Sequence, residues 1–160
     1  MTILMTLLLA VAPFSAVEYD AQVDFSRYAT WSWSTETTAA TGPLADKRIR
    51  EAIENGLTAR GLSRTEKGGE LLVGYHASKT TDIALAPIGT AAAATPTGIQ
   101  YAEKGSVVVF MVDAASGKVV WRGHVAGVLR YSPTEIAAQV KAAVETLLES
   151  LPPGLRHPAP

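Results

Sequence analysis

The sequence predicts an α+β fold: a single antiparallel, or mostly antiparallel, sheet of four or five strands with two amphipathic helices packed on one face. Three observations support this fold class. Residues 105–131 contain two apolar runs around a turn, which is the pattern of a β-hairpin. Residues 43–60 and 132–151 each place apolar side chains at helical spacing. The expected order is β-α-β-β-β-α, with a short strand after the first helix if the sheet has five strands.

The composition is that of one globular domain, with 160 residues, a formal net charge of −1 and 18% charged residues. The absence of cysteine excludes disulfides, thiolate nucleophiles and zinc sites built on cysteine. No run of lysine or arginine supplies the basic stripe that a nucleic-acid-binding surface needs. We therefore expect a single α+β domain over residues 17–153 that does not bind nucleic acid.

Residues 1–16 are expected to be an export signal. The apolar run over residues 1–14 is too short to cross a bilayer as a helix but fits the apolar part of a secretory signal. Cleavage fits best after Ala16, although Phe14 stands where a small residue is usual and no basic residue precedes the run. The alternative is a buried N-terminal strand or helix. An exported chain would be periplasmic or envelope-associated, with no transmembrane span after cleavage and, without cysteine, no lipid anchor.

Residues 17–25 alternate strictly between apolar and polar side chains, which predicts a half-buried strand with one solvated, acidic face. Residues 26–34 then carry three aromatic side chains, and Trp31 and Trp33 share one side of an extended chain. Such a pair can close the rim of a core, or it can stack on a carbohydrate or a peptide.

The first helix is expected to begin at Pro43, which suits the first helical turn, and to end at residue 60, before Gly61. Residues 62–67 suggest a short strand. Residues 70–78 alternate as a longer strand, with His76 on the side opposite its apolar residues.

Residues 80–104 show no sustained periodicity and are rich in alanine, threonine, glycine and proline. A segment of this length without a regular element predicts a flexible loop insertion. The alternative is a flap that covers an apolar ligand.

The hairpin begins with residues 107–112, which are apolar at every position and predict a central strand covered on both faces. Residues 113–117 form the turn, and residues 118–125 form an alternating second arm. The inward residues of that arm are expected to be Val119, Trp121 and Val125, and the outward residues Lys118, Arg122 and His124.

The second helix has the clearest start, because residues 132–135 read Ser-Pro-Thr-Glu, a capping box with proline at the first helical position. Two prolines and a glycine at residues 152–154 end it. The tail over residues 154–160 is expected to be loose.

Few residues suggest chemistry. His76 and His124 lie on strands that can be neighbours, and two imidazoles with a carboxylate would make a metal or acid–base site, but no metal-binding spacing supports one. Arg122 can bind an anion or lie on a wet rim. No serine-hydrolase elbow and no phosphate-binding glycine loop is present. We expect no catalytic residue, cofactor or metal, and take Trp31, Trp33, His76, Arg122 and His124 as candidate surface or binding residues.

Two motifs in this order resemble a bacterial envelope family, often of lipoproteins, known as domain of unknown function 4136. They are D-F-S-x-Y at residues 24–28 and D-x-x-S-G-K-x-V-W-R-G at residues 113–123. The resemblance covers residues 17–153 and implies an exported protein with a mixed α+β domain. It carries over no catalytic residue, and the missing cysteine departs from the lipoprotein pattern.

These observations favour a non-enzymatic, periplasmic module that binds a protein, a peptide or an envelope component such as lipid, through an open sheet edge or the exposed face of the hairpin. One alternative is a small-molecule or lipid carrier, with residues 80–104 as its lid. A third hypothesis is a hydrolase that uses His76 and His124.

Overall fold

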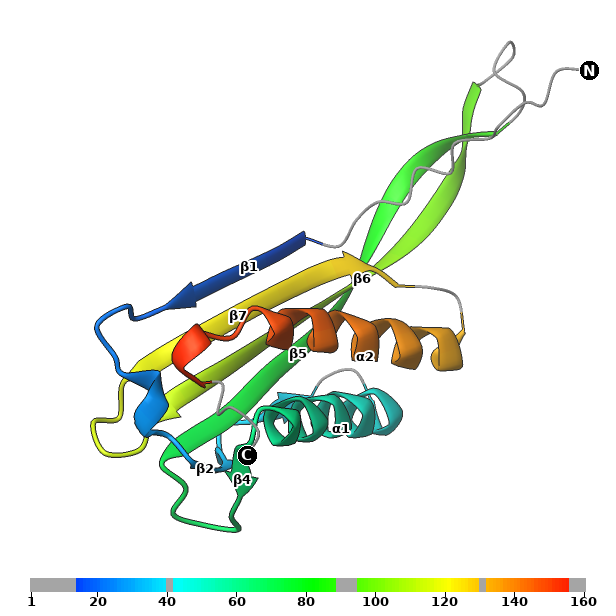
Figure 1. Cartoon of the computed structure of the whole chain (residues 1–160). Helices are drawn as coiled ribbons and strands as arrows, with labels where there is room; N and C mark the ends of the chain where they lie inside the picture. Colours follow the sequence, from blue (N-terminus) through cyan, green and yellow to red (C-terminus); the bar gives the residue numbers. More distant parts are fainter. Residues whose placement is uncertain (1–13, 40–41, 89–94, 130–131, 156–160) are drawn as a thin grey trace, which may run out of the picture.

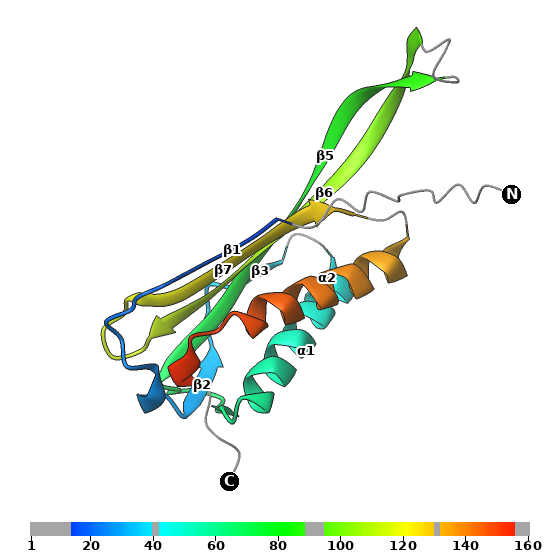
Figure 2. The same ribbon diagram turned by 45° about the horizontal axis from the view of Figure 1, so that its top comes forward.

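The computed structural model describes residues 14–39, 42–88, 95–129 and 132–155. Within these ranges the chain forms one mixed sheet, and helices α1 (Pro43–Ala59) and α2 (Pro133–Glu149) lie side by side on one of its faces (Figures 1 and 2). The predicted α+β class and the two helices are confirmed. No helix in these ranges is long and apolar enough to cross a membrane.

The sheet has seven strands in the described part of the chain, in the order β1-β7-β6-β5-β2-β4, with β3 paired to β5 off this path. The strands are β1 (Phe14–Tyr19), β2 (Thr30–Trp33), β3 (Thr38–Ala39), β4 (Ser63–Arg64), β5 (Leu71–Ile88), β6 (Thr95–Asp113) and β7 (Val119–Val128).

The prediction of an antiparallel, or mostly antiparallel, sheet of four or five strands is confirmed only in part, because the described sheet has seven strands and three short ones pair in parallel. Strands β1, β7, β6 and β5 are antiparallel, but β2 and β3 run parallel to β5, and β4 runs parallel to β2. Helix α1 is the reason, because a crossover helix returns the chain to the starting end of the sheet, and the next strand then runs parallel. The order of elements is therefore β-β-β-α-β-β-β-β-α, apart from short 3-10 turns.

The strand expected at residues 17–25 begins and ends earlier than predicted. β1 ends at Tyr19, because the carboxylate of Asp20 accepts a hydrogen bond from the Gln22 N–H (2.9 Å) and turns the chain. Asp24 then accepts from the Ser26 N–H (3.0 Å) and caps the 3-10 turn η1 (Phe25–Arg27). Residues 14–16, assigned above to the export signal, pair with β7.

Both helices follow their predicted signals. Gly61 has φ +84°, as the predicted left-handed stop after α1 requires. At the start of α2 the Ser132 hydroxyl accepts from the Glu135 N–H (3.2 Å) and donates to the Glu135 carboxylate (2.8 Å). The tail differs from expectation at Leu155, which belongs to the turn η2 (Pro153–Leu155) and is buried. Residues 156–160 lie outside the described residues.

The predicted hairpin is confirmed as β6 and β7, with Gly117 at φ +70° in its turn. The expected inward position of Val119 is wrong, because this side chain is 56% exposed. The ladder pairs Met111 with Trp121 but Val112 with Val119, so β7 contains a bulge at Val120. A bulge shifts the alternation by one residue, and Val120 is therefore buried beside Trp121.

Residues 80–104 do not form the expected loop. Strands β5 and β6 continue through this segment and stay paired from Thr80 with Lys104 to Ile88 with Thr95. The two strands form a twisted ribbon that extends beyond the helices (Figure 1). Residues 89–94, between them, lie outside the described residues.

The core lies between the helices and the adjacent face of the sheet. Its largest fully buried side chains are Trp31, Trp121, Tyr28, Tyr75, Ile49, Ile53, Leu57, Leu62, Leu71, Met111, Leu147 and Leu155. Burial of this kind supplies the main driving force for folding. The opposite face of the sheet carries no helix in the described part of the chain (Figure 2).

Candidate functional site

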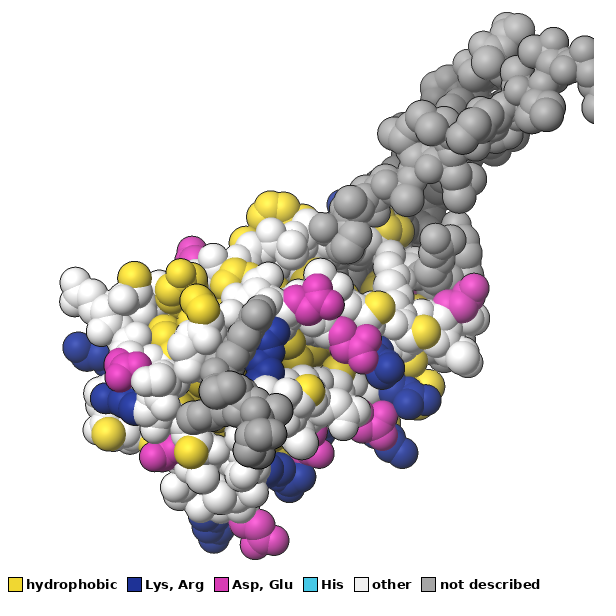
Figure 3. Space-filling model, viewed as in Figure 1, with side chains coloured by type: hydrophobic (Ala, Val, Ile, Leu, Met, Phe, Trp, Pro, Cys, Tyr) yellow, Lys and Arg dark blue, Asp and Glu magenta, His cyan; other side chains and the backbone are white. Residues whose placement is uncertain are grey.

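The uncovered side of the sheet, which we call the open face, is set by the register of its strands. One row runs from Ala16 through His124 and Val108 to His76. Residues directly opposite in a ladder point to the same face, so these four side chains share one surface. Figure 3 shows the other, helix-bearing face, where acidic and basic side chains are interspersed and no described histidine is visible.

A neighbouring row on the open face is more polar at its edge. It contains Glu18 of β1, Arg122 of β7 and Phe110 of β6, opposite Gly74 of β5. The guanidinium of Arg122 lies 2.8 Å from the Glu18 carboxylate, and both side chains are more than half exposed. An exposed pair of this kind adds at most about 1 kcal/mol to stability. Arg122 therefore lies on a wet rim, the second of the two interpretations of this residue.

The open face contains a trough with a volume of about 570 Å³. Val108, Phe110 and Val112 of β6 lie along it, and Glu18 and Glu36 are among its lining residues. The ring of Phe110 occupies the space above Gly74, where any Cβ would collide with it. Glycine at that position therefore lets an aromatic ring lie flat across the sheet.

The two candidate histidines are both on the open face but not in contact. His76 Nδ1 lies 3.2 Å from the Thr38 hydroxyl, and its ring stacks on Phe110 with 5.3 Å between centroids. His124 packs edge-on against Phe14, at 6.0 Å. Val108 separates them in the register, which places their backbones about 10 Å apart, two strand spacings.

The open face gives the hydrolase hypothesis little support. Among the described residues neither His76 nor His124 contacts a carboxylate, and no group of three potential ligands could hold a metal ion. General acid–base catalysis by these histidines would require a histidine and a carboxylate within hydrogen-bond distance of each other. The histidines instead contribute aromatic and polar surface.

The two candidate tryptophans lie on the helix side of the sheet. Trp31 is fully buried, and Trp33, half-buried, meets it edge-on at 5.1 Å. The Trp33 indole N–H donates to Glu54 of α1 (3.2 Å), and the Arg50 guanidinium lies 4.8 Å from the centre of its ring. This geometry supports the core interpretation and not the stacking platform.

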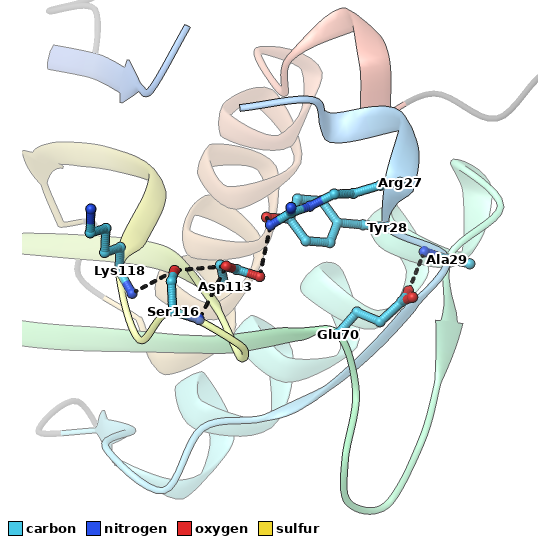
Figure 4. A network of polar contacts seen from close by, with 7 residues as sticks. All are labelled: Arg27, Tyr28, Ala29, Glu70, Asp113, Ser116 and Lys118. Carbon is cyan, nitrogen blue, oxygen red and sulfur yellow. Dashed lines mark hydrogen bonds and ion pairs between the residues drawn. The ribbon is translucent and has the colours of Figure 1, made fainter. Parts of the chain in front are cut away.

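Sequence reasoning missed a polar network at the end of the sheet where η1 meets the hairpin turn (Figure 4). Arg27 forms an ion pair with the buried Asp113 (3.1 Å) and donates to the Tyr28 hydroxyl (2.9 Å). Asp113 also accepts from the backbone N–H of Ser116 (3.2 Å) and from its hydroxyl (2.7 Å). Nearby, Glu70 accepts from the N–H of Ala29 (2.7 Å).

The titration behaviour of this network follows from its contacts. The Ser116 hydroxyl lowers the pKa of Asp113, helped by the charge of Arg27. The backbone N–H groups of Ala29 and Thr30 lower the pKa of Glu70, and burial raises the pKa of Tyr28. The two family-like motifs, residues 24–28 and 113–123, thus meet at this network, which holds the turn in place.

A second hollow, the α2 groove, lies between α2 and the sheet near the base of the ribbon. Its volume is about 590 Å³, and its described lining includes Val107, Val125, Ile136 and Ala143. The structure describes only the backbone of residues 82–88, so the side chains of this part of the expected lid are not assigned to the groove.

Taken together, a mixed sheet with two helices on one face and an open face that carries both apolar and polar side chains defines a small α+β module. The family model described as "Domain of unknown function (DUF4136)" matches residues 15–153, so the chain belongs to this family. The family resemblance is thereby confirmed. No curated protein matches the chain.

Several solved structures share the fold. A DUF4136 family protein from Bacteroides thetaiotaomicron has a TM-score of 0.59 at 15% identity, over 89% of this chain and 97% of that one. The PelC dodecamer from Paraburkholderia phytofirmans has a TM-score of 0.56 at 13% identity, over 91% of this chain and 100% of that one. A PDZ domain protein from Parabacteroides distasonis has a TM-score of 0.59 at 16% identity, over 88% of this chain but 36% of its own length.

Proposed function

We propose that this chain is a non-enzymatic, exported module of the bacterial envelope that binds another protein through its open face. One observation carries the proposal: large apolar side chains are exposed on that face. Phe14 is 64% exposed, Val119 56% and Val128 47%, and each pairs in register with an open-face residue. Val119 and Val128 lie at opposite ends of β7, so exposed apolar side chains lie at both ends of the strand, and a partner that covers them gains from the release of water.

The non-enzymatic part of the proposal is supported by the contacts of the titratable groups. The pKa values of Asp24, Glu70 and Asp113 are lowered mainly by hydrogen bonds within turns and strand ends, with a smaller contribution from the charge of Arg27. The histidines contact threonine and aromatic side chains.

Export is tested by fractionating the producing cells and sequencing the mature N-terminus. The apolar stretch over residues 1–14 supports a periplasmic or envelope-associated protein. Recovery in the periplasmic or membrane fraction is the expected result. Recovery in the cytoplasm with the full N-terminus would contradict export.

Binding through the open face is tested by site-specific photo-cross-linking in the producing cells. A photoreactive phenylalanine derivative replaces Val119 on the open face, and in a matched control it replaces Leu44 on α1, which is 46% exposed. A discrete adduct is expected from position 119 and not from position 44. Because the similar PelC chain forms a dodecamer, the adduct is also compared with a dimer of this chain. Equal labelling from both positions, or none, would contradict the proposal.

The carrier remains a second candidate because of the α2 groove, whose volume suits a small ligand. Its test is the binding of a fluorescent fatty-acid analogue. Ala143→Trp fills the groove and is expected to abolish binding, whereas Thr58→Trp on the exposed side of α1 is expected to leave it unchanged. Unaltered binding by Ala143→Trp would remove the groove as the site.

A further inference from the structure

We infer that the partner segment bound in the trough of the open face is an extended polypeptide with apolar side chains between two lysine or arginine residues. This inference rests on the proposed function and specifies the chemistry of the partner. Three properties of the trough support it: the apolar residues along its length, its negatively charged rim, and the separation of the charges.

The apolar character comes from the central strand. Val108 and Val112 are half-buried and line the trough, and Phe110 between them is buried flat over Gly74, which has no side chain. Val119 extends this surface onto β7. A partner gains from this surface only if it brings apolar side chains that displace water.

The rim of the trough is acidic. Glu18 and Asp20 lie at the β1 side, and Glu36 lies in the turn between β2 and β3. Arg122 is the one lysine or arginine among the described lining residues, and its guanidinium forms an ion pair with the Glu18 carboxylate at 2.8 Å. Two of the three carboxylates are therefore left without a cationic partner within the described residues.

The separation of these carboxylates sets the length of the partner. β7, β6 and β5 lie between β1 and β3, so the backbones at the two ends are four strand spacings apart, or about 19 Å. An extended peptide covers this distance in about six residues, at about 3.3 Å each. A strand with cations at its first and seventh residues therefore points the third and fifth side chains at the apolar trough.

The test uses the heptapeptide Lys-Ser-Val-Ser-Leu-Ser-Lys, with blocked ends, titrated into the full chain labelled with ¹⁵N. We expect chemical-shift changes at the amides of Val108, Phe110 and Arg122. The double variant Asp20→Asn/Glu36→Gln is expected to bind at least five-fold more weakly, whereas Glu66→Gln, a matched exposed control outside the trough, is expected to bind unchanged. Because all three substituted side chains are exposed, the dispersed amide spectrum serves as the check of folding.

Two comparison peptides separate the parts of the inference. The peptide with both lysines changed to glutamate is expected to bind at least ten-fold more weakly, and the peptide with serine in place of valine and leucine is expected to lose the open-face shifts. Equal binding of the glutamate peptide would overturn the charge assignment, and no open-face shifts with the lysine peptide would overturn the whole inference. In either case a discrete adduct from position 119 would still support the proposed function, so the two failures are distinguishable.

Discussion

Asp113 links three parts of the molecule through one buried carboxylate. It ends β6, accepts two hydrogen bonds from Ser116 in the hairpin turn, and pairs with Arg27 of η1. Its residue surface is only 6% exposed, so water cannot replace these contacts when one is lost. The end of the sheet therefore depends on this carboxylate being ionised.

We expect Asp113→Asn to lower the free energy of unfolding by about 1.5–3 kcal/mol at pH 7, the range for hydrogen bonds to a charged group. Because folding lowers the pKa of Asp113, its contribution is fully present above the ordinary carboxyl pKa of about 4 and is lost as the pH falls through the folded-state value. The difference between wild type and variant should therefore shrink toward pH 2. Urea unfolding at pH 7, 5 and 3 measures this.

The matched control is Glu145→Gln on the surface of α2, where the carboxylate forms an exposed ion pair with Lys141. Its expected effect is below about 0.5 kcal/mol at each pH. If Asp113→Asn behaved like this control, the network in Figure 4 would contribute nothing to stability.

The adjacent glycines of the turn before β5 are required for different reasons. A Cβ on Gly69 would overlap the backbone of Trp31 and Ser32, whereas Gly68 has φ +75° and open space around it. Gly69→Ala is expected to cost about 2 kcal/mol or more, because the backbone cannot give way as a side chain does. Gly68→Asn is expected to cost less than about 1 kcal/mol, since asparagine tolerates the left-handed region. Thermal unfolding compares the two, and equal losses would contradict the close approach at Gly69.

Short sequence motifs predicted the helix boundaries well. The capping box at Ser132 predicted the start of α2, and Gly61 predicted the end of α1. The turn with Gly117 gave the hairpin, but the bulge at Val120 could not be read from alternation, since it arises only when β7 pairs with β6. In residues 17–25 the alternating acids looked like a solvated strand face, whereas Asp20 and Asp24 cap turns.

The pairing of β1 gives a prediction about the mature N-terminus. Cleavage after Ala16 would remove three of the six residue pairs that hold β1 to β7. We expect a chain that begins at Val17 to be less stable than one that begins at Phe14 by about 1–2 kcal/mol. The shorter chain loses several backbone hydrogen bonds but loses little buried apolar surface. Chemical denaturation of the two purified chains measures the difference. Equal stabilities would show that the first half of β1 is dispensable.

The topology of the sheet depends on contacts between distant segments, which periodicity does not reveal. The parallel pairing of β2, β3 and β4 follows from where α1 returns the chain, and a single sequence does not specify this. For the same reason, the site was predicted only in part. His76, Arg122 and His124 share the open face because β7, β6 and β5 are neighbours, but the contact of Arg27 with Asp113 joins residues that no sequence spacing connects.

The sequence did not predict the ribbon of β5 and β6, because a β-ladder is held by backbone hydrogen bonds, which leave no pattern in the side chains. Alanine, threonine and glycine give no hydrophobic period, yet their N–H and C=O groups pair as well as any others. The described core reaches only to Ala77 and Val107, nearer the body of the molecule. Pairing continues outward from there past the helices (Figure 1).

This arrangement predicts that the ribbon can be shortened without loss of the fold. Asp82 and Ala102 are paired, so replacing residues 83–101 with Asn-Gly closes the hairpin with a two-residue turn and keeps the ion pair of Lys79 with Glu103. The free energy of unfolding should change by less than about 1 kcal/mol, since a shorter connection costs little entropy to close. Val107→Ala, which removes buried atoms below the ribbon, should cost about 1–3 kcal/mol for comparison. A loss of more than about 3 kcal/mol in the shortened chain would show that the ribbon stabilises the body.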